Sequence, residues 1–281
     1  MSSRISINNI LQKKKRGEKI VMLTAYDYPL AACLDEVGVD IILVGDSVAN
    51  VVLGLESTLD VDIEVMLHHT KAVSRAVKRA MVVGDMPFAS LQAGPAVALS
   101  HAKRFINEAG ADAVKVEWFD GCAELVEKMV KAGIPVMGHA GLTPQTAEAL
   151  GGFKVQGKDA AAAARILSHA KTLEEKGCFS VVLECVPARL GEFISRQLKI
   201  PTISIGAGAG CDGQVLVTQD ILGLSDRFHP KFVKTYANIG AVIKEGITRF
   251  EDDVRAGRFP ADEQSYSMSD EEFKKFLEAV K

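Results

Sequence analysis

A repeated order of helix, glycine and strand is the feature that most limits how this chain can fold. Four segments place a glycine between a helix-like stretch and an apolar run: EVGVD, EAGAD, KAGIP and EKGCF, at 36–40, 108–112, 131–135 and 175–179. Glycine often ends a helix because it adopts a left-handed backbone easily. Strands that alternate with helices form parallel sheets. The repetition therefore predicts βα units around one parallel sheet.

The number of strand-like runs favours a closed barrel over an open, doubly wound sheet. We expect eight strands, at residues 20–25, 39–45, 81–85, 112–117, 134–138, 179–184, 201–205 and 215–217. Helix-like stretches lie between them, at 62–78, 95–109, 122–132, 160–176 and 190–198. Eight strands within about 250 residues are typical of the (β/α)₈ or TIM barrel, whereas a doubly wound sheet has five or six.

No proline-rich linker or shift in composition divides the chain, so we expect one domain over residues 1–281. That domain would be the barrel with an N-terminal helix and a C-terminal helical extension. The segment after about residue 225 is predicted to form helices packed outside the barrel, the last of them in SMSDEEFKKFLEAVK. The basic run Lys13 to Arg16 is predicted to be a solvated helix end.

Composition excludes several classes of partner. The formal net charge of −3 gives no reason to expect binding to nucleic acid or anionic membranes. No segment has the roughly 18 apolar residues of a membrane span, and no secretory leader is recognisable. The five cysteines are odd in number and lack the spacing of a metal site. A reduced, cytoplasmic location is the simplest expectation.

Polar residues end five of the apolar runs. Asp46, Asp85, Glu117 and Glu184 each close a strand-like run, and His139 closes a fifth. The tips of parallel strands converge at one end of the sheet, where α/β enzymes have their active sites. Carboxylates that crowd together repel each other, so such a site needs a cation, a proton or both.

Lys115 and Glu117 are two residues apart on one strand and therefore share a face, which in a barrel is the interior. Buried there, they are costly unless paired or bound to metal. Carboxylates without nearby cysteines favour Mg²⁺ over Zn²⁺. Such an ion could chelate a 2-oxo acid and stabilise its enolate, while a separate unligated Glu removes the proton.

Structural explanations exist for each of these residues alone. An Asp after a strand often caps the next helix, Lys115 with Glu117 could be an ion pair, and His139 could be a satisfied buried histidine. Five consecutive strand ends with polar tips are not required by capping.

Three other segments of the chain also have more than one interpretation. The loop 206–210 could bind an anion or be a tight turn, and 141–158 could be a lid over the site. The GxGxxG match at 208–213 precedes a strand rather than a helix, which argues against a dinucleotide site.

Motifs along nearly the whole chain resemble one family, ketopantoate (3-methyl-2-oxobutanoate) hydroxymethyltransferase. The similarity covers about residues 5 to 266 in the right order. The motifs are MLTAYDYP (22–29), VGDSVANVVLG (44–54), STLDV (57–61), HTKAV (69–73), GDMPF (84–88), AVKVE (113–117), GIPVMGHAGLTPQ (133–145), GGFKVQGK (151–158), VVLECVP (181–187), PTISIGAGAGCDGQVLV (201–217) and KFVKTYA (231–237).

The resemblance implies a TIM barrel of the phosphoenolpyruvate/pyruvate type that makes 2-dehydropantoate for pantothenate and coenzyme A synthesis. It implies one Mg²⁺ per subunit, 5,10-methylenetetrahydrofolate as hydroxymethyl donor and 3-methyl-2-oxobutanoate as acceptor. The oxo acid and the folate would be the chain's small-molecule partners. A homo-oligomer, a decamer in the family, is also implied.

Carried over residue by residue, the resemblance implies that Asp46 and Asp85 are metal ligands and that Glu117 is the third acid of the metal site. Glu184 matches the proton acceptor. The residues that match contacts to the oxo acid, including one further polar site residue, are Asp46, Ser47, Asp85, Lys115 and His139. Two positions depart from similar sequences, Asn50 and Gln264.

Two other functions stay open from the residues alone. Another Mg²⁺-dependent 2-oxo acid aldolase or lyase of the same barrel type would share the acidic site, but it would need a lid cysteine or other groups that we do not find. Dependence on folate separates the two. A non-catalytic barrel that binds an oxo acid is a different class, and Mg²⁺-dependent proton exchange in the oxo acid would exclude it.

Overall fold

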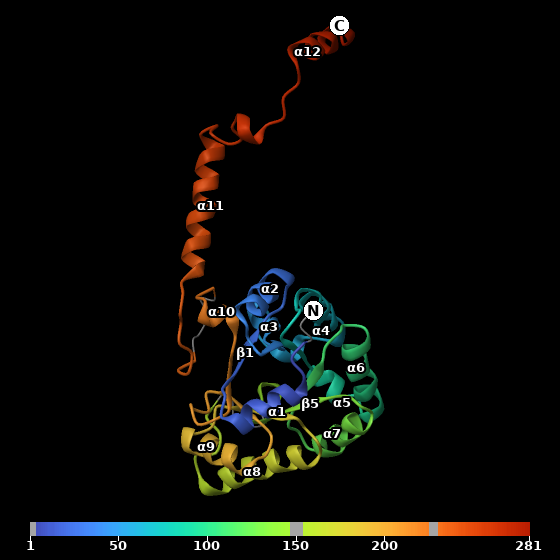
Figure 1. Cartoon of the computed structure of the whole chain (residues 1–281), viewed down its shortest axis with the longest axis vertical. Helices are drawn as coiled ribbons and strands as arrows, with labels where there is room; N and C mark the ends of the chain where they lie inside the picture. The colour runs from blue at the N-terminus through green and yellow to red at the C-terminus, as the bar shows by residue number, and fades with distance from the viewer. Residues whose placement is uncertain (1–3, 147–153, 225–229) are drawn as a thin grey trace.

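The described strands pair in chain order, and the last returns to pair with the first, so they form a closed parallel barrel (Figure 1). The computed structural model describes residues 4–146, 154–224 and 230–281. The strands are β1 Ile20–Thr24, β2 Ile41–Val44, β3 Met81–Asp85, β4 Ala113–Glu117, β5 Val136–Gly141, β6 Ser180–Glu184, β7 Thr202–Ile205 and β8 Gly213–Leu216. The predicted TIM barrel is confirmed.

Helices surround this barrel, and the predicted helix–glycine–strand order is confirmed. The four glycines of the repeat, Gly38, Gly110, Gly133 and Gly177, have φ of +96°, +73°, +80° and +95°. The helices up to the end of the barrel are α1 Ile7–Arg16, α2 Tyr28–Val37, α3 Val48–Val51, α4 Ile63–Ala76, α5 Phe88–Gln92, α6 Pro95–Asn107, α7 Cys122–Lys131, α8 Ala160–Glu175, α9 Ala188–Gln197 and α10 Thr218–Ile221, with 3₁₀ turns η1 Thr58–Asp60 and η2 Pro144–Thr146.

Alternate residues of β4 belong to two different cores. Val114 and Val116 of β4 lie in the core between the sheet and the helices. Ala113, which shares its face with Lys115 and Glu117, belongs to the core inside the barrel. The alternation follows from the two-residue period of a strand. It places the charged pair of β4 inside the barrel, as predicted, at the end where β4 finishes.

Helix α1 covers the N-terminal end of the barrel. Its Ile10 is fully buried in the interior core. Lys13 Nζ lies 2.9 Å from Asp40 Oδ1, and Lys14 Nζ lies 2.7 Å from Asp212 Oδ2. The prediction of a solvated helix end is therefore wrong for these two lysines, because their long side chains reach acids at the starts of strands.

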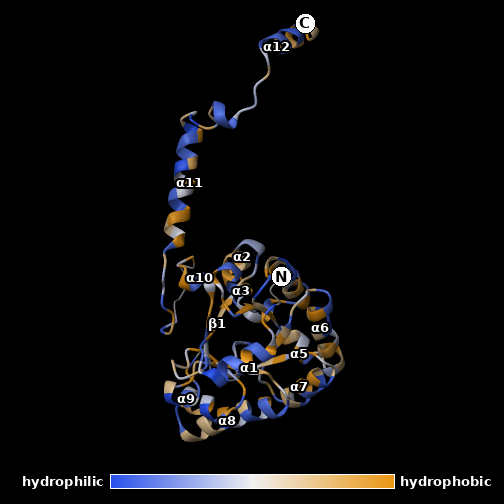
Figure 2. Cartoon of the chain, in the orientation of Figure 1, coloured by the Kyte–Doolittle hydropathy of each residue, from blue (hydrophilic) through white to orange (hydrophobic). Residues whose placement is uncertain are grey.

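The C-terminal segment projects away from the barrel (Figure 1). It contains α11 Ile239–Arg255, the 3₁₀ turn η3 Asp262–Gln264 and α12 Asp270–Ala279, and no residue of α11 or α12 is buried. The prediction that these helices pack against the barrel is wrong. Helix α11 is amphipathic, with apolar and polar residues along its length (Figure 2), and periodicity does not say which surface covers the apolar face. Among the described helices, none is long and apolar enough to cross a membrane.

Candidate active site

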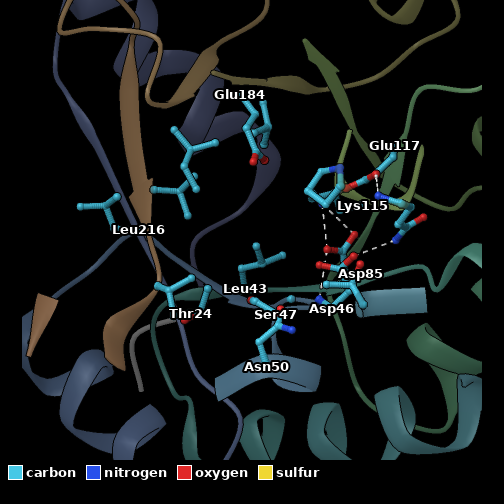
Figure 3. Close-up of a pocket in the computed structure, with 18 of the residues that line it drawn as sticks. Thr24, Leu43, Asp46, Ser47, Asn50, Asp85, Lys115, Glu117, Glu184 and Leu216 are labelled. Atoms are coloured by element: carbon cyan, nitrogen blue, oxygen red, sulfur yellow. Dashed lines mark hydrogen bonds and ion pairs between the residues drawn. The ribbon is translucent and has the colours of Figure 1, made fainter. Parts of the chain in front are cut away.

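A cavity of about 730 Å³ opens at the carboxyl ends of the strands. Its wall has an acidic part from the ends of β2, β3 and β4 and an apolar part from β6, β7 and β8, with Glu184 beside the apolar part (Figure 3). Residues of the apolar part are Val182, Ile205, Val215 and Leu216. The predicted residues Asp46, Ser47, Asp85, Lys115, Glu117 and Glu184 all line the cavity.

The acidic part is built around one lysine. Lys115 Nζ donates to Asp85 Oδ1 and Oδ2 at 2.9 and 2.8 Å and lies 3.7 Å from Glu117 Oε1. The backbone N–H of Asp46 donates to Asp85 Oδ2 at 3.3 Å. We call Asp46, Asp85, Lys115 and Glu117 the carboxylate cluster. All four residues are buried, so their charges interact strongly with one another.

The pKa values of the acids in the cluster shift in different directions. Burial, followed by the neighbouring charges of Asp85 and Glu117, raises the pKa of Asp46 to about 8. Burial also raises the pKa of Asp85, although Lys115 opposes the shift. Burial acts to lower the pKa of Lys115, but the surrounding carboxylates outweigh it and raise that pKa. Burial acts to raise the pKa of Glu117 as well, but His139 and Lys115 outweigh it and lower that pKa.

His139 connects Glu117 with Glu184. Its Nδ1 lies 3.1 Å from Glu117 Oε1, and its Nε2 lies 3.2 Å from Glu184 Oε2. The second contact is close, but Nε2 has no well-aligned hydrogen-bond partner in the described part of the chain. Burial and Lys115 disfavour the charged imidazolium, yet the two glutamates outweigh them and raise the pKa of His139 to about 9. His139 thus holds a positive charge between two carboxylates at neutral pH.

Gln145 is a site residue to which no role was assigned from the sequence. Its Nε2 donates to Asp46 Oδ2 and to the backbone oxygen of Met86, both at 3.1 Å, and its own backbone N–H donates to Glu117 Oε2 at 3.1 Å. Gln145 ends the GIPVMGHAGLTPQ motif, four residues after β5. Extending the search for polar residues beyond the strand end into that loop would have found it.

Two residues from the start of α3, Ser47 at its N-cap and Asn50 within it, complete the polar wall. Ser47 Oγ lies 2.7 Å from the hydroxyl of Tyr26. Asn50, one of the two departures from similar sequences, also lines the cavity, and its Nδ2 donates to the backbone oxygens of Leu55 and Glu56 at 3.0 and 3.2 Å. These two hydrogen bonds fix the backbone of Leu55 and Glu56, where the segment 56–59 that lines the cavity begins.

The carboxylate cluster suits a hard divalent cation in its chemistry. Its possible ligand atoms are carboxylate oxygens, and a cation would offset the burial and the neighbouring negative charges that raise the pKa of Asp46. Within the described residues, however, no three His, Cys, Asp or Glu side chains are arranged to hold a metal ion. Glu117 is already engaged with His139 and the backbone of Gln145. Asp85 is engaged with Lys115 through both oxygens. The carboxylates of Asp46 and Asp85 still fit such a cation in their chemistry, because Mg²⁺ commonly uses one or two carboxylates and keeps several waters.

The two ambiguous loops lie differently with respect to the cavity. Residues 206–210 are not among those that line the cavity, and Gly206 and Gly208 have φ of +72° and +87°, a backbone that both a tight turn and an anion-binding loop can adopt, so the two alternatives stay open. The predicted lid, 141–158, includes 147–153, which lie outside the described residues. Pro144 and Gln145, in the part of that segment that is described, line the cavity.

Comparison with known sequences finds close relatives of the whole chain. A sequence model of the family described as ketopantoate hydroxymethyltransferase matches residues 4–262. The 3-methyl-2-oxobutanoate hydroxymethyltransferase of Syntrophus aciditrophicus is 56% identical over 263 residues, 94% of this chain and 97% of that protein. The enzyme of the same name from Carboxydothermus hydrogenoformans is 52% identical over 268 residues, 95% of this chain and 97% of that protein.

Solved structures that resemble this one share its fold at low sequence identity. Phosphonopyruvate hydrolase superposes with a TM-score of 0.60 at 12% identity, over 100% of this chain and 98% of that one. The 2,3-dimethylmalate lyase, described as a member of the PEP mutase/isocitrate lyase superfamily, gives 0.58 at 13% identity, over 97% and 98%. The barrel is therefore of the type found in that superfamily.

Proposed function

The chain belongs to the ketopantoate hydroxymethyltransferase family, and we propose that its acidic cavity is where the family's one-carbon transfer takes place. The reaction transfers a hydroxymethyl group to 3-methyl-2-oxobutanoate, a step of pantothenate biosynthesis. One observation carries the assignment to this cavity. A carboxylate cluster in which the pKa of Asp46 is raised lies in the same wall as a separate glutamate, Glu184.

In this proposal Asp46 and Asp85 would hold one Mg²⁺ per subunit, and Glu117 would be the third acid of the site. The ion, when bound, supplies a Lewis acid that stabilises the enolate of the oxo acid. Lys115, which lies 2.8 Å from Asp85, places a fixed positive charge where the enolate oxygen develops its negative charge. Ser47 lies in the wall next to Asp46 and would contact the oxo acid.

Glu184 is the proposed proton acceptor. It ends β6 and faces the cavity, and its side chain is 14% exposed, so a bound substrate can reach it. It removes the proton from the carbon next to the keto group, and that carbon then forms a bond to the one-carbon unit. The two bonds of that unit to the folate nitrogens break, one water supplies the hydroxyl group, and tetrahydrofolate leaves. The positive charge of His139, 3.2 Å away, holds one carboxylate oxygen of Glu184 and leaves the other for the substrate.

The remaining cavity is suited to the organic parts of the substrates. The apolar side chains of Val182, Ile205, Val215 and Leu216 would receive the branched end of the oxo acid. The cavity extends beyond them to residues 56–59 and 230–233, which leaves room for a second, larger molecule. We assign that space to the proposed donor, 5,10-methylenetetrahydrofolate.

We also propose that the chain works as a homo-oligomer, a decamer as the family resemblance implies, in the cytoplasm. An apolar stripe on α11 supports the homo-oligomer. Its residues recur at helical spacing and are 45–61% exposed: Ile243, Ile247, Phe250 and Val254. The unpaired state of all five cysteines supports a reducing location. Replacing Ile247 and Phe250 by Glu should lower the mass measured by sedimentation, and an unchanged mass would exclude this face from the assembly.

An assay of product formation tests the proposed function. Purified chain is incubated with 3-methyl-2-oxobutanoate and methylenetetrahydrofolate, with Mg²⁺ or with a chelator. We expect 2-dehydropantoate only when both substrates and the cation are present. Product formed without folate, or at the same rate in chelator, would contradict the proposed donor or the proposed cation respectively.

A further inference from the structure

One buried amide connects the ends of three strands. The side chain of Gln145 joins Asp46, after β2, to the backbone of Met86, after β3, and its backbone joins Glu117 of β4, each through a hydrogen bond of 3.1 Å. Gln145 is 3% exposed, so water does not compete for these contacts. The side-chain amide engages Oδ2 of Asp46, which leaves Oδ1 of that carboxylate for another group.

The other end of this amide accepts nothing. Gln145 Oε1 is buried and has no hydrogen-bond partner in the described residues, although Gln145 lines the cavity. Buried oxygens without a donor are uncommon in folded proteins. We therefore expect a donor to be supplied when the cavity is filled.

The chemistry of the reactants limits what that donor can be. The oxo acid has a carboxylate and a keto oxygen, both of which accept hydrogen bonds and donate none. The proposed folate does carry N–H donors, but it is absent when the cation is titrated alone. The ammonium group of Lys115 is engaged with both oxygens of Asp85. A magnesium ion held by only two carboxylates keeps bound water, and such water is a strong donor.

We propose that Gln145 is a positioning residue for the cation: its Nε2 fixes Asp46, and its Oε1 accepts a hydrogen bond from a cation-bound water. This inference rests on the proposed function, because it requires a cation on Asp46 and Asp85. Groups that act on a metal through its ligands or its water usually change metal affinity 10–100-fold when they are removed.

Two substitutions of similar size separate this role from simple packing. Gln145→Leu removes both the donor and the acceptor, and we expect the affinity for Mg²⁺ or Mn²⁺ to fall about tenfold. Gln145→Glu also loses the N–H donor to Asp46 but keeps an acceptor oxygen, so we expect its cation affinity to lie above that of Gln145→Leu. A packing role would weaken binding equally in both variants, and that result would overturn the proposal.

The affinities are measured by calorimetric titration of the full chain with the cation alone, without substrates. Gln219→Leu is the matched control, because Gln219 is another buried amide whose Oε1 has no partner in the described part, and it is not among the residues that line the cavity. We expect its affinity to equal that of the wild type. Equal affinities in wild type and Gln145→Leu overturn only the role of Gln145. Absence of binding in the wild type overturns the proposed cation site itself and this inference with it.

Discussion

The two ends of the barrel both carry acidic residues, but they handle the negative charge in opposite ways. At the N-terminal end, an Asp precedes each of β2, β4 and β8 and accepts a backbone N–H from the preceding strand at 2.8–2.9 Å. Each of these acids also pairs with a basic residue of the first 14 residues. The pairs are Asp40 with Lys13, Asp112 with Arg4, and Asp212 with Lys14.

At the opposite end the acids mostly face one another. Asp46, Asp85 and Glu117 lie around one lysine, and the pKa of Asp46 is raised to about 8, first by burial and then by its neighbours. Glu117 also pairs with His139, which helps to lower its pKa. The acids at the N-terminal end are thus paired by the chain itself, whereas Asp46 and Asp85 at the C-terminal end have raised pKa values and suit an added cation. A carboxylate at a strand end is evidence of function only when the protein leaves its charge uncompensated.

The largest expected effect is at the catalytic end. Glu184→Gln keeps the shape of the side chain but cannot accept the proton, so we expect kcat to fall by about 10³-fold, within the range for a general base. Binding of the oxo acid should change little. Exchange of the substrate proton with deuterated water, followed by NMR, measures the step directly, and undiminished exchange would remove Glu184 from this role.

The matched control for that variant lies at the other end. Glu174 accepts the backbone N–H groups of Lys199 and Ile200 through Oε1, at 2.6 and 3.0 Å, and lies away from the cavity. Glu174→Gln should therefore leave proton exchange at the wild-type rate. Equal losses in both variants would show that the comparison between the two ends is wrong.

Cation affinity should depend on pH. Because the pKa of Asp46 is raised to about 8 in the cation-free chain, a cation must displace a proton below that pH. We expect the affinity to rise about tenfold per pH unit from pH 6 to pH 8 and then to level off. Titration calorimetry in buffers of different ionisation enthalpy measures the protons released, and a count of zero at pH 7 would contradict the raised pKa.

Stability should respond most at the N-terminal end. Asp212→Asn removes the ion pair with Lys14. It also weakens the hydrogen bonds that Asp212 Oδ2 accepts from the Ser195 hydroxyl and the Thr202 backbone N–H. We expect a loss of about 2 kcal/mol in the free energy of unfolding, with kcat unchanged. Denaturant unfolding measures the loss. A fall in kcat without a loss of stability would contradict the structural role given to Asp212.

The last expected effect is on the pH dependence of stability. A carboxyl whose pKa is raised on folding stabilises less as pH rises above its ordinary value, so Asp46 should lower the melting temperature of the cation-free chain between about pH 4 and 8. His139, whose pKa is raised to about 9, loses its contribution between about pH 6.5 and 9, in the same direction. Asp46→Asn should reduce the fall in melting temperature between about pH 4 and 8. Added Mg²⁺ should reduce the same fall, with its largest effect at pH 8. An unchanged slope in the variant would contradict the assignment to Asp46.

Most of the barrel could be predicted from the sequence, because buried parallel strands are continuous apolar runs and glycines mark the helix ends. The start of β8 was missed by two residues. That strand begins at Gly213, where a Cβ would lie 2.6 Å from the backbone oxygen of Ile20, so the close approach of β1 requires the residue that weakens the strand pattern. At Gly213 the strand preference of the residue is low, but the close packing of β8 against β1 leaves no room for a side chain.

The site was predictable only where its residues end strands. Asp46, Asp85, Lys115, Glu117 and Glu184 do so or lie next to a strand end, and the structure brings them into one cavity. Gln145 lies beyond the strand in a loop, and its contacts depend on the path of that loop. The partners of Lys13 and Lys14 are 27 and 198 residues away along the chain, and no local pattern identifies contacts at such separations.

Closure of the barrel between β1 and β8 has a consequence for how the chain is made. Ile20 pairs with Gly213, so the free edge of β1 has no partner until almost the whole barrel sequence exists. At roughly 5–20 residues per second, a ribosome needs on the order of ten seconds or more to supply that partner. During this time an apolar strand edge is open to other chains. Expression at lower temperature or with chaperones should therefore raise the soluble yield by limiting association of nascent chains rather than by stabilising the finished fold.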